Sequence, residues 1–152
     1  MYISSKITSE FATWVDSKIQ NIALKRKKCL ILDLDNTLWG GVLGEEGING
    51  IQIGGDYPGK AFLYFQEALS ALSKEGIILS VCSKNKRRRC IEAWEQNPFM
   101  VLRKKDFVAI RINWNDKASN IVELSKELNI GLDSMVFIDD NPAERELVKQ
   151  TL

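Results

Sequence analysis

The sequence predicts an α/β fold in which a parallel β-sheet is covered by helices on both faces. Short apolar segments alternate along the chain with longer segments of helical periodicity, which is the pattern of repeated strand–helix units. Polar residues directly follow three of the apolar segments, as expected where parallel strands end at one edge of a sheet. The 152 residues suit one domain with a substantial core.

The chain begins with a predicted helix and then a buried strand. Residues 8–24 carry apolar side chains at helical spacing, and residues 25–28 form a basic run that suits the solvated C-terminal end of a helix. Residues 29–34 are the first predicted strand, with Asp33 and Asp35 at its carboxyl end. Side chains two residues apart on a strand point the same way, so we expect both carboxylates to face one point above the sheet.

A glycine-rich segment and a long helix come next. Residues 39–53 contain five glycines among apolar residues, which predicts a hairpin flap. Pro58-Gly59 opens a helix that extends to about Lys74, and Gly76 suits the position just after its end.

Two further strand–helix units follow the long helix. The predicted strand over 77–82 ends at Ser83, and Asn85 is placed to cap a helix over 86–96. A weaker strand is predicted over 106–110.

The C-terminal part repeats the same alternation. Asn115 or Asp116 can cap a helix that Gly131 closes, and residues 135–138 form the fourth predicted strand. Asp139 and Asp140 follow that strand. Pro142 suits the first position of a last helix, with Leu147 and Val148 facing inward. The chain ends soon afterwards, which leaves open whether it is an excised piece of a longer protein.

Composition excludes several classes of function. The net charge of +1 provides no field for nucleic acid or anionic membrane, and no apolar run approaches the roughly 20 residues of a membrane span. The absence of histidine removes His-based metal sites and Ser-His-Asp triads. The three cysteines are irregularly spaced, and no signal peptide precedes them, so we expect a reducing, cytoplasmic location.

The polar residues at the strand ends form a candidate active site for phosphoryl groups. Clustered carboxylates repel one another unless a cation neutralises them, and hard oxygen ligands favour Mg²⁺. A phosphoryl group would be held by the cation, the Ser83 hydroxyl and Lys117, which begins a predicted helix. Asp33 could then attack phosphorus, while Asp35 protonates the leaving oxygen and later activates water.

These residues also resemble the motifs of the haloacid dehalogenase (HAD) superfamily. Asp33-Leu-Asp-Asn-Thr-Leu is similar to its first motif, DxDx[TV], and Ser83, Lys117 and the pair Asp139-Asp140 match the next three in order. The resemblance implies a three-layer Rossmannoid domain, in which Asp33 is nucleophile and metal ligand and Asp35 is the acid/base, with its backbone carbonyl on the metal. Metal binding by Asp140, with Asp139 beside it, is implied as well, and so are substrate contacts from Thr37, Ser83, Lys84, Asn85 and Lys117.

Longer phrases resemble the FkbH-like group of that superfamily. They are Asp33-Leu-Asp-Asn-Thr-Leu-Trp-Gly-Gly, Val81-Cys-Ser-Lys-Asn, Asn113-Trp-Asn-Asp-Lys-Ala-Ser-Asn and Phe137-Ile-Asp-Asp-Asn-Pro-Ala-Glu-Arg. The group is associated with dephosphorylating bisphosphoglycerate and loading a glyceryl unit onto the phosphopantetheine thiol of an acyl carrier protein in polyketide-type pathways. The resemblance covers about residues 29–150. We expect a catalytic domain over 29–152, preceded by a helical extension over 1–28 that lies outside the resemblance.

Three features leave alternatives open. Cys82 beside Ser83 is either a thiol that carries the acyl group or a buried core cysteine. The intervals Asp33–Ser83 and Ser83–Lys117 are too short for a cap domain, so we expect an open site that suits a macromolecular substrate. The cations Lys84 and 86–89 are either a solvated helix face or a dock for the carrier protein. Trp39 and Trp114 flank motif residues and either line the site or pack in the core.

Two alternative functions remain beside the FkbH-like reaction. They are a generic HAD phosphatase and a non-catalytic docking module.

Overall fold

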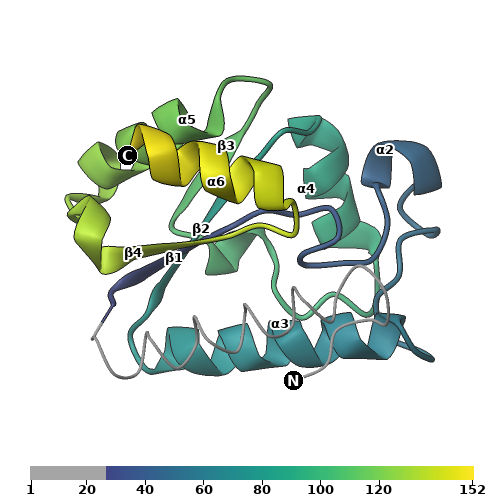
Figure 1. Ribbon diagram of the computed structural model, residues 1–152. Helices are drawn as coiled ribbons and strands as arrows, with labels where there is room; N and C mark the ends of the chain where they lie inside the picture. Colours follow the sequence, from purple (N-terminus) through teal and green to yellow (C-terminus); the bar gives the residue numbers. More distant parts are fainter. Residues whose placement is uncertain (1–26) are drawn as a thin grey trace.

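The computed structural model describes residues 27–152 as one parallel sheet with helices on both faces (Figure 1). The predicted helix over 8–24 lies outside the described residues. The strand order is β3-β2-β1-β4, with every neighbouring pair parallel. The strands are β1 (Cys29–Leu32), β2 (Ile78–Ser83), β3 (Ala109–Ile112) and β4 (Met135–Ile138). The predicted α/β class and parallel sheet are therefore confirmed.

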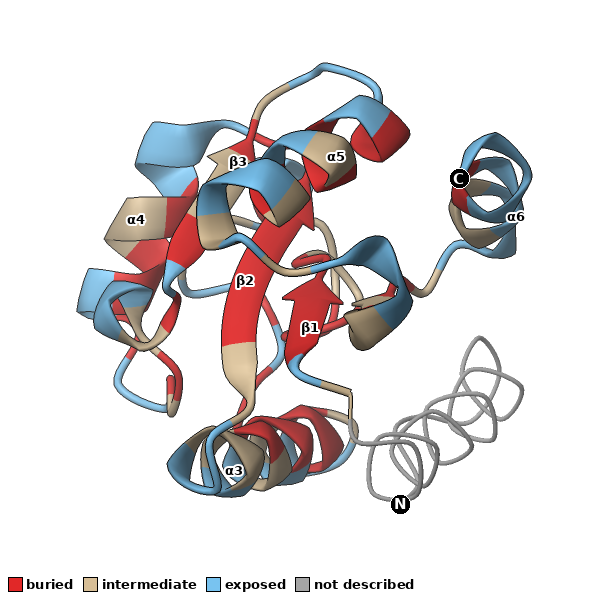
Figure 2. Cartoon of the chain, turned by 90° about the vertical axis from the view of Figure 1, so that its left-hand side faces the viewer, coloured by how far each residue is buried: buried red, intermediate tan, exposed pale blue. Residues whose placement is uncertain are grey.

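Four helices cover the sheet in two layers (Figures 1 and 2). On one face, α3 (Gly59–Lys74) and α4 (Arg87–Gln96) pack in a core that contains Leu30 and Leu32 of β1. On the other face, α5 (Lys117–Leu128) and α6 (Pro142–Thr151) pack in a second core with Cys29 and Ile31. Helices on both faces explain why β1 reads as a continuous apolar run, since all four of its residues are fully buried.

The strand order creates a crevice between β1 and β4. These strands are neighbours, but the chain leaves β1 toward α3 on one face and leaves β4 toward α6 on the other. Such a switch point opens a crevice at the carboxyl ends of the strands, where open α/β sheets bind ligands. The first residues past β1 and β4 are Asp33 and Asp139.

Local signals in the sequence placed several helix ends correctly. The helix α3 follows Pro58 and ends before Gly76, which has a φ of 103°. Asp116 caps α5, since its carboxylate accepts a hydrogen bond of 3.0 Å from the backbone N–H of Ser119. Pro142 begins α6. Each of these signals acts within one helical turn.

The predicted flap hairpin over 39–53 is wrong in detail. One antiparallel bridge joins Gly40 and Gln52, whose backbone groups exchange two hydrogen bonds of 2.8 Å. The chain between them forms the short helix α2 (Leu43–Glu46) rather than two strands. Glycines interrupt the alternation that a hairpin needs, and the helical turn instead buries Leu43 in the core.

Other boundaries also differ from those predicted. The first strand ends at Leu32, two residues early, and the third covers Ala109–Ile112 because a 3₁₀ turn occupies Lys104–Asp106. The cap of α4 is Lys86 rather than Asn85. Asn129, with a left-handed φ of 53°, ends α5 before Gly131 is reached.

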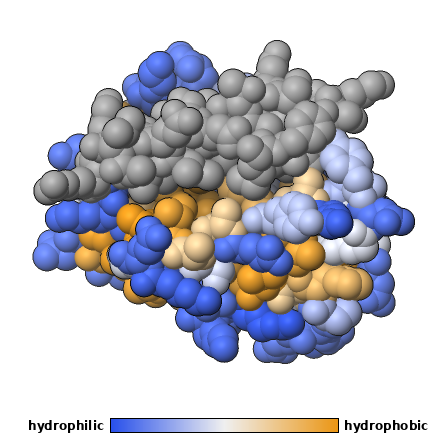
Figure 3. Space-filling model, turned by 90° about the horizontal axis from the view of Figure 1, so that it is seen from below, coloured by the Kyte–Doolittle hydropathy of each residue, from blue (hydrophilic) through white to orange (hydrophobic). Residues whose placement is uncertain are grey.

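The exposed surface also differs from one prediction. In α6, Val148 faces the core but Leu147 is 47% exposed. Apolar and hydrophilic residues are intermixed on the face seen from below (Figure 3). Tyr64 of α3 is half exposed. Among residues 27–152, no helix is long and apolar enough to cross a membrane.

The two intervals that could hold a cap domain contain only small elements. Between Asp33 and Ser83 the chain forms α2, α3 and β2, and between Ser83 and Lys117 it forms α4, the 3₁₀ turn and β3. Within residues 27–152 no second domain covers the carboxyl edge of the sheet, as the sequence predicted.

Candidate active site

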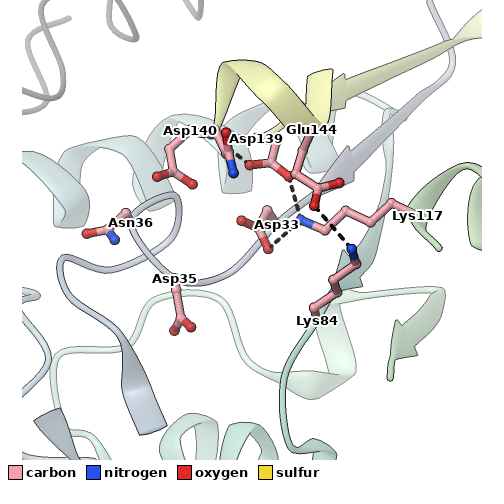
Figure 4. Close-up of a pocket in the computed structure, with 9 residues that line it drawn as sticks. Asp33, Asp35, Asn36, Lys84, Lys117, Asp139, Asp140 and Glu144 are labelled. Atoms are coloured by element: carbon pink, nitrogen blue, oxygen red, sulfur yellow. Dashed lines mark hydrogen bonds and ion pairs between the residues drawn. The ribbon is translucent and has the colours of Figure 1, made fainter. Parts of the chain in front are cut away.

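A buried ion network lies in the crevice between β1 and β4 (Figure 4). Asp33 continues the line of β1, since its backbone N–H donates to the carbonyl of Ile138 at 3.0 Å. The Lys117 Nζ atom lies 3.4 Å from Asp33 Oδ1 and 2.5 Å from Asp139 Oδ2. All three side chains are almost fully buried, so water screens their charges little.

The position of Lys117 follows from the local sequence. Asp116 caps α5, and Lys117 is the first residue of that helix. The alternation of β1 directs Asp33 to the same side of the sheet as Ile31, which is the side that α5 covers. Burial alone would lower the pKa of the Lys117 ammonium, but the carboxylates of Asp33 and Asp139 raise that pKa above its ordinary value. Lys117 therefore stays charged.

Three carboxylates converge beside the ammonium. Asp33, Asp139 and Asp140 each offer an oxygen, and these atoms lie within 4.8 Å of one another. Burial, and then the charge of Asp139, raises the pKa of Asp33 to about 8 and the pKa of Asp140 to about 7. One lysine does not offset this accumulation of negative charge. The donor set, all hard oxygen, fits a divalent cation such as Mg²⁺.

The carboxylates of Asp139 and Asp140, which follow β4, are not equivalent. Asp139 is 1% exposed, and both of its oxygens are used, by Lys117 and by the backbone N–H of Asn141 at 2.9 Å. Asp140 is half buried, and both residues line the pocket. That Asp140 is the direct metal ligand and Asp139 supports it stays a prediction.

Asp35 is held quite differently from Asp33. Its Oδ1 atom accepts hydrogen bonds from the indole N–H of Trp39 and the backbone N–H of Leu43, both at 3.0 Å. Its Oδ2 atom accepts one from the amide of Asn85, also at 3.0 Å. In Figure 4 the two carboxylates point in different directions, although both line the pocket. They do not aim at one point, because Asp33 continues the line of β1 whereas Asp35 is held by donors from the flap and from Asn85.

The pocket has a volume of about 180 Å³. It contains six residues that the sequence predicted, and it adds three that sequence reasoning missed. Its lining is Asp33, Asp35, Asn36, Lys84, Lys117, Asp139, Asp140, Asn141 and Glu144. Glu144 lies one turn after Asp140 on α6, and its Oε1 atom pairs with Lys84 Nζ at 3.2 Å. The left-handed φ of 58° at Asn36, a residue type that tolerates this region, marks the turn between Asp35 and the flap.

Four predicted site residues do not line the pocket. Ser83 and Asn85 are nearly buried at the end of β2, and Thr37 is fully buried, with a hydroxyl that has no hydrogen-bond partner among residues 27–152. Asn85 contacts the site indirectly, through Asp35.

Cys82 faces the core rather than the pocket. Its side chain is fully buried, and its Sγ atom donates to the backbone carbonyl of Lys117 at 3.8 Å. Burial raises the pKa of the thiol to about 12, so it is protonated at neutral pH. Of the two alternatives for Cys82, this environment favours the core cysteine. The acyl-carrying role stays a prediction.

The fold and the acidic pocket together define a phosphatase domain of the HAD type. The family model described as "NLI interacting factor-like phosphatase" matches residues 28–152, and the chain belongs to this family. A search of curated proteins gave no match.

One similar solved structure is the N-terminal part of the protein BF1531 from Bacteroides fragilis, which contains a phosphatase domain and is complexed with Mg. The two sequences are 51% identical, and the TM-score is 0.81. The match covers 88% of this chain but only 36% of the solved chain. The comparison therefore concerns one part of a longer protein.

Proposed function

We propose that this chain is a Mg²⁺-dependent phosphatase domain that acts through a phosphoenzyme on Asp33. The observation that carries the proposal is the ion network, in which Lys117 lies between Asp33 and Asp139 and three carboxylate oxygens gather within 4.8 Å. Asp33, Asp140 and the backbone carbonyl of Asp35 would hold Mg²⁺. When bound, the ion would neutralise the carboxylates and the phosphoryl oxygens. The Mg²⁺ complex of the similar solved structure supports this assignment.

The proposed reaction has two steps. A carboxylate oxygen of Asp33 attacks phosphorus, the bond from phosphorus to the leaving oxygen breaks, and Asp35 donates a proton to that oxygen. Asp35 then removes a proton from water, which attacks the phosphorus of the aspartyl-phosphate and releases phosphate. Lys117, which lines the pocket, binds phosphoryl oxygens in both steps. Lys84 lines the pocket and contacts the incoming substrate.

At a finer level, we propose the FkbH-like reaction: dephosphorylation of bisphosphoglycerate with transfer of the glyceryl unit to an acyl carrier protein. The four phrases around Asp33, Ser83, Lys117 and Asp140 support this activity. The uncapped edge of the sheet supports a macromolecular partner. The complete set of Asp33, Asp35 and Lys117 counts against a non-catalytic docking module. The three thiols, all free and buried, support a reducing compartment such as the cytoplasm.

A basic surface beside the pocket supports the carrier-protein partner. It consists of Lys84 and residues 86–89, all exposed, at the carboxyl end of β2. Trp114 lies on the adjacent loop and is 69% exposed, while the backbone of its neighbour Asn113 donates to the carbonyl of Ser83 at 3.2 Å. Exposed arginine and tryptophan are typical of protein interfaces, and the positive charge is complementary to an acidic partner.

The test has two stages. Purified protein should release phosphate from p-nitrophenyl phosphate with Mg²⁺, and Asp33→Asn should abolish this release, since the nucleophile is gone. If Asp33→Asn keeps its activity, the phosphoenzyme is wrong. In the second stage, wild-type protein is incubated with bisphosphoglycerate and a holo carrier protein, and the mass of the carrier is measured. A carrier that gains no glyceryl mass contradicts the transferase and leaves the generic phosphatase.

A further inference from the structure

We infer that Trp39 and Asn85 are positioning residues that hold Asp35 ready for proton transfer. The inference rests on the proposed function, in which Asp35 is the general acid and base. Neither side chain lines the pocket, so neither is placed to touch substrate. Both act through Asp35.

The donors surround the carboxylate of Asp35 and come from two segments of the chain, the flap and the loop after β2. The indole N–H of Trp39 and the backbone N–H of Leu43 donate to Oδ1, and the amide of Asn85 donates to Oδ2. Each distance is 3.0 Å. Leu43 is the first residue of α2, and Asn85 follows β2, so the contact joins the flap to the loop after the second strand.

The two side-chain donors are themselves fixed. Trp39 is fully buried, and its ring packs in the core with Phe62 and Leu43. The Oδ1 atom of Asn85 accepts from the backbone N–H of Lys86 at 2.9 Å, so the amide NH₂ must face Asp35. Because both side chains are buried, water competes little for these hydrogen bonds.

The arrangement leaves Asp35 able to exchange a proton. A carboxylate offers about four lone-pair sites. Three of them are occupied here, and the remaining one is available to a leaving oxygen or to water. Neutral donors fix the orientation of the carboxylate without adding a positive charge beside Lys117. Losing one donor would let the carboxylate rotate away from the leaving group.

The dependence of activity on the leaving group of the substrate distinguishes a positioning role from a general structural role. A good leaving group departs without a proton, whereas an alkyl alcohol needs one. We therefore compare kcat/KM for a series of phosphate monoesters, from p-nitrophenyl phosphate to alkyl phosphates, in wild type, Trp39→Phe and Asn85→Ala. Each variant should lose at least about tenfold on alkyl esters and less than about threefold on the nitrophenyl ester. Asp35→Asn should give the steepest dependence on the leaving group.

The chain offers a matched control in Trp94. Trp94 is also fully buried, but its indole N–H has no hydrogen-bond partner among residues 27–152. Trp94→Phe makes the same change of side chain as Trp39→Phe without breaking a hydrogen bond. It should leave the dependence on the leaving group at the wild-type value. An equal loss on all esters in Trp39→Phe and Asn85→Ala would overturn the inference.

An NMR measurement tests the hydrogen bond between Trp39 and Asp35 without turnover. The indole N–H resonance of Trp39, assigned by its loss in Trp39→Phe, should shift when Asp35→Asn removes the charged acceptor. The indole resonance of Trp94 should stay in place. If wild type hydrolyses no ester but the Trp39 resonance shifts, the proposed function fails and the contact stands. A Trp39 resonance that ignores Asp35→Asn overturns the inference.

Discussion

Asp33 and Asp35 are two residues apart, yet the structure places them in two different environments. Asp33 lies with Asp139 and Lys117 in a buried network of ionisable groups. Asp35 lies beside the flap and accepts only neutral hydrogen bonds. Burial, and then the negative charge of Asp139, raises the pKa of Asp33 to about 8. Whether Asp33 is ionised at neutral pH therefore depends on the charges around it. Two identical side chains thus acquire different roles from their surroundings.

The difference originates in the backbone between them. The backbone of Asp33 still pairs with β4, whereas Asp35 directly precedes the turn at Asn36 and contacts the flap. Asp33 remains on the side of α5 and α6. A charged side and a neutral side of one pocket should respond differently to substitution.

The largest effect is expected when the charged side loses its cation. Lys117→Met should lower the free energy of unfolding of the metal-free protein by about 3–5 kcal/mol, because Asp33 and Asp139 are left buried without a partner. Denaturation in urea at neutral pH measures this loss. Lys126→Met, at an exposed position of α5, is the control and should change the stability by less than about 0.5 kcal/mol. A similar small loss of unfolding free energy in both variants would contradict the proposed difference between the charged and the neutral side of the pocket.

The second prediction concerns pH. The pKa values of Asp33 and Asp140 in the folded protein, about 8 and about 7, exceed the ordinary value of about 4. Between these limits the folded state binds more protons than the unfolded state, so stability falls as pH rises from about 4 to 8. The Tm of metal-free protein should drop on the order of 5 °C from pH 5 to pH 8.

Two comparisons test the origin of that pH dependence. Added Mg²⁺ should raise Tm more at pH 8 than at pH 5, because the ion binds the ionised carboxylates. Asp33→Asn combined with Asp140→Asn should flatten the profile. A Tm that rises with pH in metal-free wild type would contradict the accumulation of negative charge in this network.

On the neutral side, each hydrogen bond should contribute much less. Trp39→Phe should cost about 1 kcal/mol more than Trp94→Phe, since only the first breaks a hydrogen bond and both remove the same ring atoms. Thermal or urea denaturation of the two variants measures the difference. A difference as large as the loss in Lys117→Met would mean that Asp35 is held as strongly as Asp33.

The smallest effect is expected at Cys82, which packs behind Lys117. The folded protein at pH 8 should resist iodoacetamide at this position, because the thiol is fully buried and has a pKa of about 12. Peptide mapping after native and denaturing treatment measures the modification. Alkylation of Cys82 in the native state, or a glyceryl adduct that disappears in Cys82→Ser, would instead support the acyl-carrying role.

Much of this architecture could be predicted from local patterns. The apolar run before Asp33, the cap at Asp116 and the proline that begins α6 each act within a few residues, so the sequence predicts them directly. The convergence of Asp33, Lys117 and Asp139 followed from one further assumption, that the strands are parallel. The roles of these residues remain predictions until the variants are measured.

Other features could not be predicted because they depend on contacts between distant segments. The sequence determined that acidic residues follow β1 and β4 and that a lysine begins α5. Tertiary structure decided that Asp35 turns to Trp39 and Asn85, that Glu144 enters the pocket beside Lys84, and that Cys82 faces the core. The physical reason is that side-chain direction at a strand end depends on where the strand stops. Here Asp33 continues the line of β1, whereas contacts with the flap, rather than the apolar pattern, set the direction of the Asp35 side chain.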